Sequence, residues 1–395
     1  MPPVPVSPMF KRAKGRLKEL VHSLQLGKPA TAWALSPYPD GKAFGFTIVH
    51  DADSAYSRRL APIFDAFDAI GLKITVTVFP LWAAWAPDPA RIWSDWRRQD
   101  PFFAPVAVPL EEPEEARFYI DLRRRGHEIA MHTPSETSSP REDVIRAFTL
   151  FKSVFGSPPR TYVEHSPDNN LDAQKRHGSN PASPYYNTDL LNHSECWVWV
   201  CDDDTSFSRT LDQQFNVLSD KDGPFCPRAL EKFGIRRAFL RSPTKPSDGD
   251  GFLAAFDDRT LDVLEQQRGL ALVYTHLAAG WLDPVTRRLR HDIATHLEAL
   301  ARRNVWFAPA ATILDRFAAL RQVELRSSRS MLEVANRSGV HLTGLTVATP
   351  PGLTLRDEDG MLLPDLPGSF VNLGEFHPGT TRRFPIVQCN SYALD

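Results

Sequence analysis

The sequence predicts an α/β protein, a distorted TIM-like (β/α)7–8 barrel followed by a small all-β module. First, short runs rich in Val, Ile and Phe alternate with helical stretches from residue 43 to about residue 322. Second, these runs are apolar on both sides, which is typical of parallel strands covered by helices on both faces. Third, the pattern changes near residue 325, where short apolar segments alternate with turns that contain Gly or Pro. We therefore expect a barrel over 43–322 and a β-module over 325–395.

Eight barrel strands are expected, each a short apolar run bounded by polar or turn-forming residues. Their ranges are 43–50, 73–80, 127–131, 160–165, 197–201, 236–240, 270–276 and 304–308. Seven or eight β/α units over about 280 residues match the usual size of a TIM-like barrel. In such barrels the chemistry collects at the carboxyl ends of the strands.

Three of the intervening helices have clear signals in the sequence. The first spans 60–70, where Leu60, Ile63, Phe64 and Phe67 fall on one side. The second is expected to start at Ser139 and Pro140, an N-cap followed by a proline in the first turn. The third is expected to open at Asp283 and Pro284, with a buried stripe made of Leu289, Ile293, Leu297 and Leu300.

Residues 1–42 are expected to be a basic helical extension. Basic residues between positions 11 and 18 precede Leu20, Val21 and Leu24, which gives a short amphipathic helix. Such a helix would contact an anionic membrane surface or a lipid-linked substrate, or it would pack as a solvated helix on the protein body. Residues 1–10 lack the apolar segment of a secretory signal, so we expect a cytoplasmic protein.

The β-module is expected to be a small sandwich-like accessory unit. Its short strand-like segments are residues 331–335, 340–348, 352–355 and 370–373. The module would either bind carbohydrate or cap the barrel, and it shows no aromatic platform that would favour binding.

The net charge and the cysteine spacing argue against a nucleic-acid-binding protein and against a cysteine-based metal site. The formal net charge of −2 argues against a nucleic-acid-binding protein, because neutralising phosphates requires a basic excess. Cys196, Cys201, Cys226 and Cys389 have no zinc-ribbon or CxxC spacing. Buried free thiols are therefore favoured over a disulfide or a metal site.

Two motifs that each end a strand carry the chemistry. Asp51 and Asp53 close the apolar run that begins at Phe44. About eighty residues later, a second strand-like run ends at His132, and Glu136 follows four residues beyond it. Carboxylates and imidazoles at the ends of strands supply the base and the ligands that a hydrolytic metal site needs. His165, Arg241, His276 and the carboxylates of 202–204 also follow strands.

In this order, the motifs resemble those of the polysaccharide deacetylase family, the NodB-homology domain of carbohydrate esterase family 4. The resemblance covers roughly residues 43–320. Its first motif is Phe46-Thr47-Ile48-Val49-His50-Asp51-Ala52-Asp53, its second is Gly126-His127-Glu128-Ile129-Ala130-Met131-His132-Thr133-Pro134-Ser135-Glu136, and its last is Leu272-Val273-Tyr274-Thr275-His276. The resemblance implies that Asp51 is the catalytic base, Asp53 and His132 are metal ligands and His276 is the general acid.

Two positions depart from the family pattern. Glu136 stands where the family has a second histidine, which makes the expected triad Asp53, His132 and Glu136. Val163 stands where the third motif carries an arginine that orients the base, and we expect Arg241 to replace it. His165 is a candidate replacement ligand, and substrate binding is assigned to Asp202, Asp204 and Trp281. A divalent metal is expected, with zinc first and manganese, cobalt or nickel as alternatives.

The resemblance implies a metal-dependent deacetylase. It would hydrolyse the N-acetyl or O-acetyl group of a sugar or polysaccharide in cell-envelope or exopolysaccharide metabolism. Two alternatives stay open, a metal-free amide hydrolase on the same barrel and a catalytically inactive glycan-binding barrel. The presence of Asp51, Asp53 and His132 together favours activity, because a barrel that only binds glycan does not require a base and two ligands.

Overall fold

A computed structural model of the chain describes residues 32–53, 55–83, 107–165, 168–200, 232–239, 246 and 248–388. Its centre is a parallel sheet with the strand order β7-β6-β5-β4-β3-β2-β8, in which β9 also pairs with β2. The strands are β2 (Phe44–His50), β3 (Thr75–Val78), β4 (Glu128–Met131), β5 (Thr161–Val163), β6 (Trp197–Trp199), β7 (Ala238–Phe239), β8 (Leu270–Thr275) and β9 (Val305–Phe307). All eight coincide with expected strands, so the α/β class and the parallel sheet are confirmed.

The sheet is curled but open. Strands β2 to β7 follow one another in chain order, and β8 returns to the other side of β2, as a barrel requires. Within the described part of the chain, β7 and β8 are the two edges and do not pair with each other. β2 is the central strand, because it pairs with β3, β8 and β9 and all seven of its residues are buried. The sheet is therefore a half-barrel built outward from β2.

Helices connect the strands as the alternating pattern predicts. They are α2 (Ala61–Ala69), α4 (Pro113–Arg124), α5 (Arg141–Phe155), α6 (Thr188–His193), α8 (Gly249–Ala255), α9 (Asp258–Gln266), α10 (His291–Ala301) and α11 (Ala310–Leu320). The helix expected to open at Asp283 begins only at His291. The reason is local, since the Asp283 carboxylate accepts hydrogen bonds from the N–H groups of Val285 and Thr286 and closes a turn. Similarly, the N-cap of α5 is Pro140 rather than Ser139.

The C-terminal part of the chain forms two antiparallel sheets, with the strand orders β1-β12-β15-β14 and β10-β11-β16-β13. The strands are β1 (Ala34–Leu35), β10 (Val323–Ser327), β11 (Met331–Asn336), β12 (Leu342–Ala348), β13 (Leu353–Leu355), β14 (Asp365–Leu366), β15 (Phe370–Phe376) and β16 (Thr381–Gln388). β1, from the N-terminal side of the barrel, pairs with β12, a pairing that the sequence analysis did not predict. The expected basic helix lies outside the described residues.

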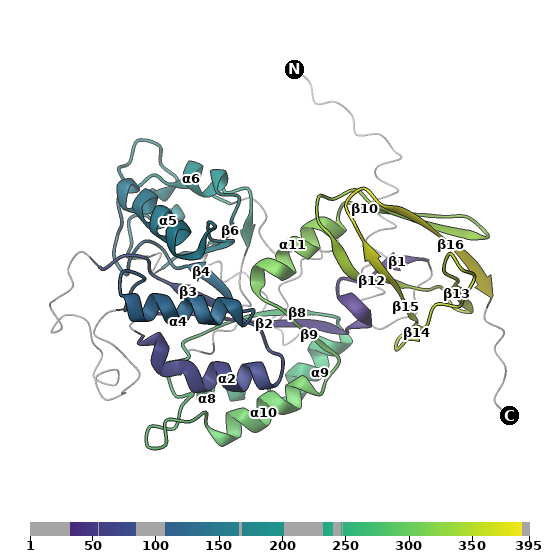
Figure 1. Cartoon of the computed structure of the whole chain (residues 1–395), viewed down its shortest axis with the longest axis horizontal. Coiled ribbons are helices and arrows are strands. Elements are labelled where there is room, and N and C mark those ends of the chain that lie inside the picture. Colours follow the sequence, from purple (N-terminus) through teal and green to yellow (C-terminus); the bar gives the residue numbers. More distant parts are fainter. Residues whose placement is uncertain are drawn as a thin grey trace.

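Helix α11 joins the half-barrel to the β-module, and Figure 1 shows it between the two. Its apolar face shares one core with residues of β8 and β12, among them Leu272 and Leu345. The buried side chain of Arg316 donates hydrogen bonds to the carbonyl oxygens of Pro37 and Thr343. Burial lowers the pKa of Arg316 to about 10, and these carbonyl contacts stabilise the guanidinium there.

The expectation of buried free thiols can be checked for one of the four cysteines. Cys196 is a buried free thiol, whereas the other three cysteines lie outside the described residues. In the part of the chain that the structure describes, no helix has the length and apolar character needed to cross a membrane.

The buried carboxylate of Glu128 ties the amino-terminal end of the sheet to α11. Its Oε2 accepts hydrogen bonds from the Thr75 hydroxyl at 2.8 Å and the Ala311 N–H at 3.0 Å. Its Oε1 accepts from the Thr161 hydroxyl at 2.6 Å. Burial raises the pKa of Glu128. The N-terminus of α11 has a positive partial charge, which stabilises the ionised carboxylate beside it.

We therefore expect Glu128→Ala to lower the free energy of unfolding by about 2–4 kcal/mol, because it leaves buried donors without an acceptor. Urea unfolding followed by circular dichroism measures this change. The control is Glu298→Ala, at an exposed position of α10, which should shift the value by less than about 0.5 kcal/mol. Equal effects of the two substitutions would contradict the anchoring role of Glu128.

Candidate metal centre

Five candidate residues lie together at the carboxyl end of the sheet. Asp51 and Asp53 follow β2, His132 follows β4, His165 follows β5 and His276 follows β8. Their ligand atoms form two overlapping groups, each within 4.8 Å of one another. One group is Asp53, His132 and His165, and the other is Asp51, Asp53 and His276.

The two aspartates are held by the strands on either side of β2. The Asp51 N–H donates to the carbonyl oxygen of Thr275 in β8 at 3.0 Å. The Ala52 N–H donates to the Thr77 hydroxyl in β3 at 3.0 Å. The Asp53 N–H then donates to Asp51 Oδ1 at 3.0 Å, and this hydrogen bond fixes the Asp51 carboxylate relative to the backbone of Asp53. The Asp-x-Asp motif is thus a turn supported from both sides.

His132 faces both carboxylates. Its Nδ1 lies 3.0 Å from the carbonyl oxygen of Val163, which can only accept a hydrogen bond, so Nδ1 carries a proton. Its Nε2 lies 3.1 Å from Oδ1 of Asp51 and 3.1 Å from Oδ1 of Asp53. The Phe79 ring packs against the imidazole with a centroid separation of 4.7 Å. The orientation of the ring is therefore set by a carbonyl on one side and an apolar wall on one face.

His165 completes the group from β5. Its Nε2 lies 3.2 Å from Asp53 Oδ2, and its Nδ1 lies 3.1 Å from the side-chain amide of Asn170. The Asn170 atom next to Nδ1 is the amide nitrogen, which donates, so in this arrangement Nδ1 accepts and Nε2 carries the proton that faces Asp53. A metal on Nε2 would require the Asn170 amide to turn so that its oxygen accepts a hydrogen bond from Nδ1. Asn170 could not be selected from the sequence, because it lies in a loop that is rich in polar residues.

Charge balance dominates the electrostatics of this cluster. Burial by itself raises the pKa of Asp51 and of Asp53, but the neighbouring imidazoles outweigh it and hold both pKa values below the ordinary one. Burial by itself lowers the pKa of His132, yet the two carboxylates raise it to about 10. The pKa of His165 is also raised, because Asp53 outweighs burial. The carboxylates are therefore ionised at neutral pH, and they attract positive charge.

His276 lies on the other side of Asp51. Its Nε2 is 3.7 Å from Asp51 Oδ2 and 3.9 Å from Asp53 Oδ2, and the Tyr274 hydroxyl lies 3.1 Å from the same nitrogen. The side chain of His276 is 13% exposed and that of His165 is 14% exposed, against 1% for His132, so solvent reaches both His276 and His165. Tyr274 is the penultimate residue of β8 and Phe79 directly follows β3, so a search of the residues around the carboxyl end of each strand would have identified both.

Two of the expected site residues lie apart from this cluster. Glu136 belongs to no ligand group, and His165 takes the third position. Thr133 has a left-handed φ of 53°, and the chain then bends over 134–137 without forming a helical turn, so a spacing of four does not place Glu136 beside His132. Trp281 is fully buried and packs edge-on against Phe67, and it therefore offers no surface to a substrate. Arg241, Asp202 and Asp204 lie outside the described residues.

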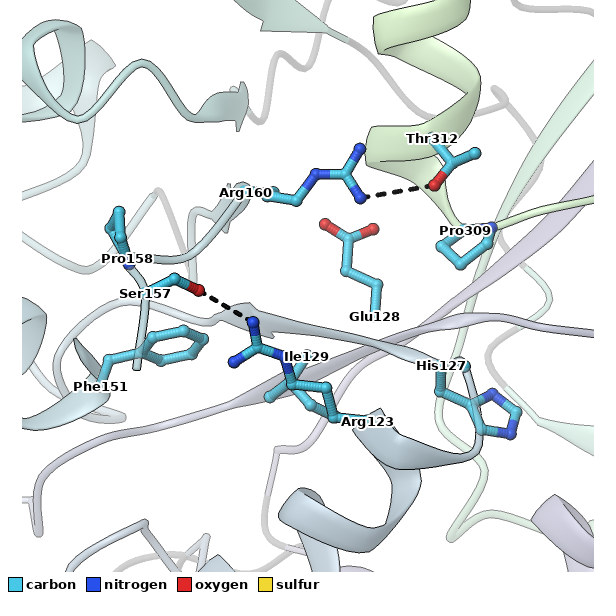
Figure 2. Close-up of a pocket in the computed structure, with 11 residues that line it drawn as sticks. Arg123, His127, Glu128, Ile129, Phe151, Ser157, Pro158, Arg160, Pro309 and Thr312 are labelled. Carbon is cyan, nitrogen blue, oxygen red and sulfur yellow. Dashed lines mark hydrogen bonds between the residues drawn. The ribbon is translucent and has the colours of Figure 1, made fainter. Parts of the chain in front are cut away.

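A separate cavity of about 190 Å³ lies at the opposite, amino-terminal end of β4. Figure 2 shows Arg123 and Arg160 on either side of it and Glu128 between them. Arg123 is bonded to Ser157 and Arg160 to Asp315, while both oxygens of Glu128 already accept hydrogen bonds from the fold. These side chains hold the structure together, so the chemistry is assigned to the carboxyl end.

The donor set at that end fits a divalent transition metal. Asp53 supplies a carboxylate oxygen, and His132 and His165 supply imidazole nitrogens whose Nε2 atoms both point at that carboxylate. Two imidazoles and one carboxylate are a donor set that zinc and its neighbours accept. A metal there would also compensate the buried negative charge now balanced by the imidazoles.

No protein-family model matches the chain, and no curated protein matches its sequence. The similar solved structures include a Mycobacterium smegmatis protein assigned as a polysaccharide deacetylase (14% identity, TM-score 0.42, 76% of this chain and 98% of that one). They also include the Puue allantoinase, with 12% identity and a TM-score of 0.38 over 72% of this chain and 93% of that one. A mutant of a CE4 family pseudoenzyme has 9% identity and a TM-score of 0.33 over 71% of this chain and 72% of that one. Polysaccharide deacetylases, which the motifs resemble, are thus among these structures. At such identities and TM-scores the similarities support no conclusion about activity.

The ligand set is tested by substitution. We expect Asp53→Ala, His132→Ala and His165→Ala each to reduce the metal that survives dialysis at least tenfold, because each removes a ligand. Glu136→Ala is the control and should retain the wild-type content. Metal is measured by mass spectrometry after dialysis against metal-free buffer. Loss of metal in Glu136→Ala, with retention in His165→Ala, would restore the triad expected from the sequence.

The pKa of His132 gives a pH-dependent prediction for the metal-free protein. Its pKa of about 10 in the folded chain exceeds the ordinary value of roughly 6.5. The imidazolium therefore stabilises the fold fully below pH ~6.5, and this contribution is lost as the pH rises through 10. We expect the stability advantage of the wild type over His132→Gln to shrink between pH 7 and pH 10, as measured by urea unfolding. An advantage that does not change with pH would contradict the charge pairing.

Proposed function

We propose that the protein is a metal-dependent carbohydrate deacetylase that hydrolyses the N-acetyl group of a sugar in cell-envelope or exopolysaccharide metabolism. The observation that carries this proposal is the arrangement of five side chains at the carboxyl end of the parallel sheet. Asp53, His132 and His165 form a ligand set, and Asp51 and His276 lie beside it with an Oδ2–Nε2 distance of 3.7 Å.

The roles follow from position and charge. Asp53, His132 and His165 would hold the metal ion, which when bound supplies a Lewis acid that polarises the acetyl carbonyl. Asp51 has a lowered pKa and is ionised at neutral pH, so it can accept a proton from the attacking water. His276, whose Nε2 lies 3.7 Å from Asp51 Oδ2, is placed to donate a proton to the departing group.

The presence of an acid supports an amide substrate. An amine departs only after it gains a proton, whereas an alkoxide is a better leaving group and depends less on an acid. His276 therefore favours N-acetyl over O-acetyl hydrolysis. The assignment to sugars rests on the resemblance of the three strand-end motifs to those of polysaccharide deacetylases.

Activity is tested by acetate release from N-acetylated and O-acetylated oligosaccharides with zinc-, cobalt- or manganese-loaded protein. We expect Asp51→Asn to lower kcat about 10²–10⁴-fold while KM changes little, because the substitution removes the proton acceptor. His276→Gln should slow N-acetyl hydrolysis more than O-acetyl hydrolysis. Asp359→Asn, at an exposed turn of the β-module, is the matched control and should keep full activity.

The alternatives predict other results. A metal-free amide hydrolase would retain its activity after chelation and in the His165→Ala variant. A glycan-binding barrel would bind acetylated oligosaccharides without releasing acetate under any metal. Either result would overturn the proposal.

A further inference from the structure

The β-module carries a second group of ligand-type side chains, formed where β12 and β15 meet. Leu342 of β12 pairs with Phe376 of β15 in an antiparallel register. His341 precedes the first of these residues and His377 follows the second, so the two histidines are cross-strand neighbours. Their rings stack with a centroid separation of 4.2 Å and an interplanar angle of 14°. The strands themselves lie side by side in the module (Figure 1).

Glu375 adds a carboxylate to the same place. It lies two residues before His377, which puts both side chains on one face of the chain. Its Oε2 is 3.5 Å from His341 Nε2, and one ligand atom from each of the three residues lies within 4.8 Å of the others. All three side chains are exposed, and His341 is the only ion-pair partner of Glu375 among the described residues.

A buried asparagine fixes the backbone that presents these side chains. Asn336 is 0% exposed, and its side-chain amide donates to the carbonyl oxygens of Val340 at 2.9 Å, Phe376 at 3.1 Å and His377 at 3.3 Å. One side chain therefore holds both the residue before His341 and His377 itself. Because the backbone is already in position, only side-chain rotations are needed to bring the three ligand atoms together.

We propose that His341, Glu375 and His377 bind a divalent transition-metal ion, with zinc as the ion that fits the donors best. Two imidazole nitrogens and one carboxylate oxygen suit Zn²⁺, Ni²⁺ and Cu²⁺ and do not suit Mg²⁺ or Ca²⁺, which require oxygen ligands. Tetrahedral zinc with ligand bonds of about 2.0–2.2 Å needs donor atoms roughly 3.3 Å apart. Exposed side chains reach that spacing by small rotations from the present arrangement.

This site is independent of the centre on the half-barrel. It shares no residue with Asp53, His132 and His165, and it belongs to β12 and β15 of the module rather than to the parallel sheet. An ion there would bridge the ends of two neighbouring strands. Three protein ligands leave a fourth position open to water or to a donor from another molecule.

The test is equilibrium dialysis of the full chain against about 10–100 μM free zinc, in the wild type and in a His132→Ala background that removes the barrel centre. We expect His341→Ala and His377→Ala to bind one zinc equivalent less than their parent in both backgrounds. Glu375→Gln should weaken binding at this site at least tenfold.

His193→Ala, which removes an exposed histidine of α6, is the control and should bind as much zinc as its parent. Circular dichroism verifies that each variant is folded, as expected for exposed positions. Equal zinc binding by the parent, His341→Ala and His377→Ala would overturn the proposal and leave a stacked histidine pair only. Because the His132→Ala background isolates this site, failure of the proposed deacetylase function would not alter the result.

Discussion

The structure depends on the compensation of two neighbouring carboxylates, one buried and one half-buried. Asp51 and Asp53 directly follow β2, the strand that pairs with three others; Asp51 is buried and Asp53 is half-buried. Buried negative charges require nearby positive charge, and the sheet supplies it from three further strands as His132, His165 and His276. The same attraction that balances these charges makes the place suitable for a metal ion. The negative charge of Asp51 and Asp53 therefore explains both the surrounding imidazoles and the suitability of the site for a metal ion.

Much of the architecture could be predicted, because the strands of a covered parallel sheet are short, apolar and regularly spaced. All eight barrel strands were found in this way, as were Asp51, Asp53, His132 and His276 at their ends. What could not be predicted depends on the path of the chain after a strand. Thr133 turns the chain in a left-handed conformation, so Glu136 leaves the group and His165, on the next strand, enters it. Trp281 follows His276 by five residues but turns into the core, which spacing alone does not reveal.

The amino-terminal end of the parallel sheet stabilises the fold, whereas its carboxyl end carries the candidate metal centre. At the amino-terminal end, Glu128 uses both oxygens to bind β3, β5 and the start of α11, which packs against the β-module. At the carboxyl end, backbone groups orient the Asp51 and His132 side chains, and the Nε2 atoms of His132 and His165 face the carboxylate of Asp53. Rigidity at one end thus positions the reactive groups at the other. The β-module adds to this frame through β1, the strand from the N-terminal side of the barrel that pairs with β12.

The central claim is that Asp53, His132 and His165 bind one metal ion beside an uncoordinated Asp51. The most direct measurement is a crystal structure of zinc-loaded protein with anomalous data collected on both sides of the zinc absorption edge. The account predicts an anomalous peak at about 2.0–2.2 Å from the Nε2 atoms of both histidines and from one oxygen of Asp53. The absence of a peak there, or a peak coordinated by Glu136 in place of His165, would contradict it.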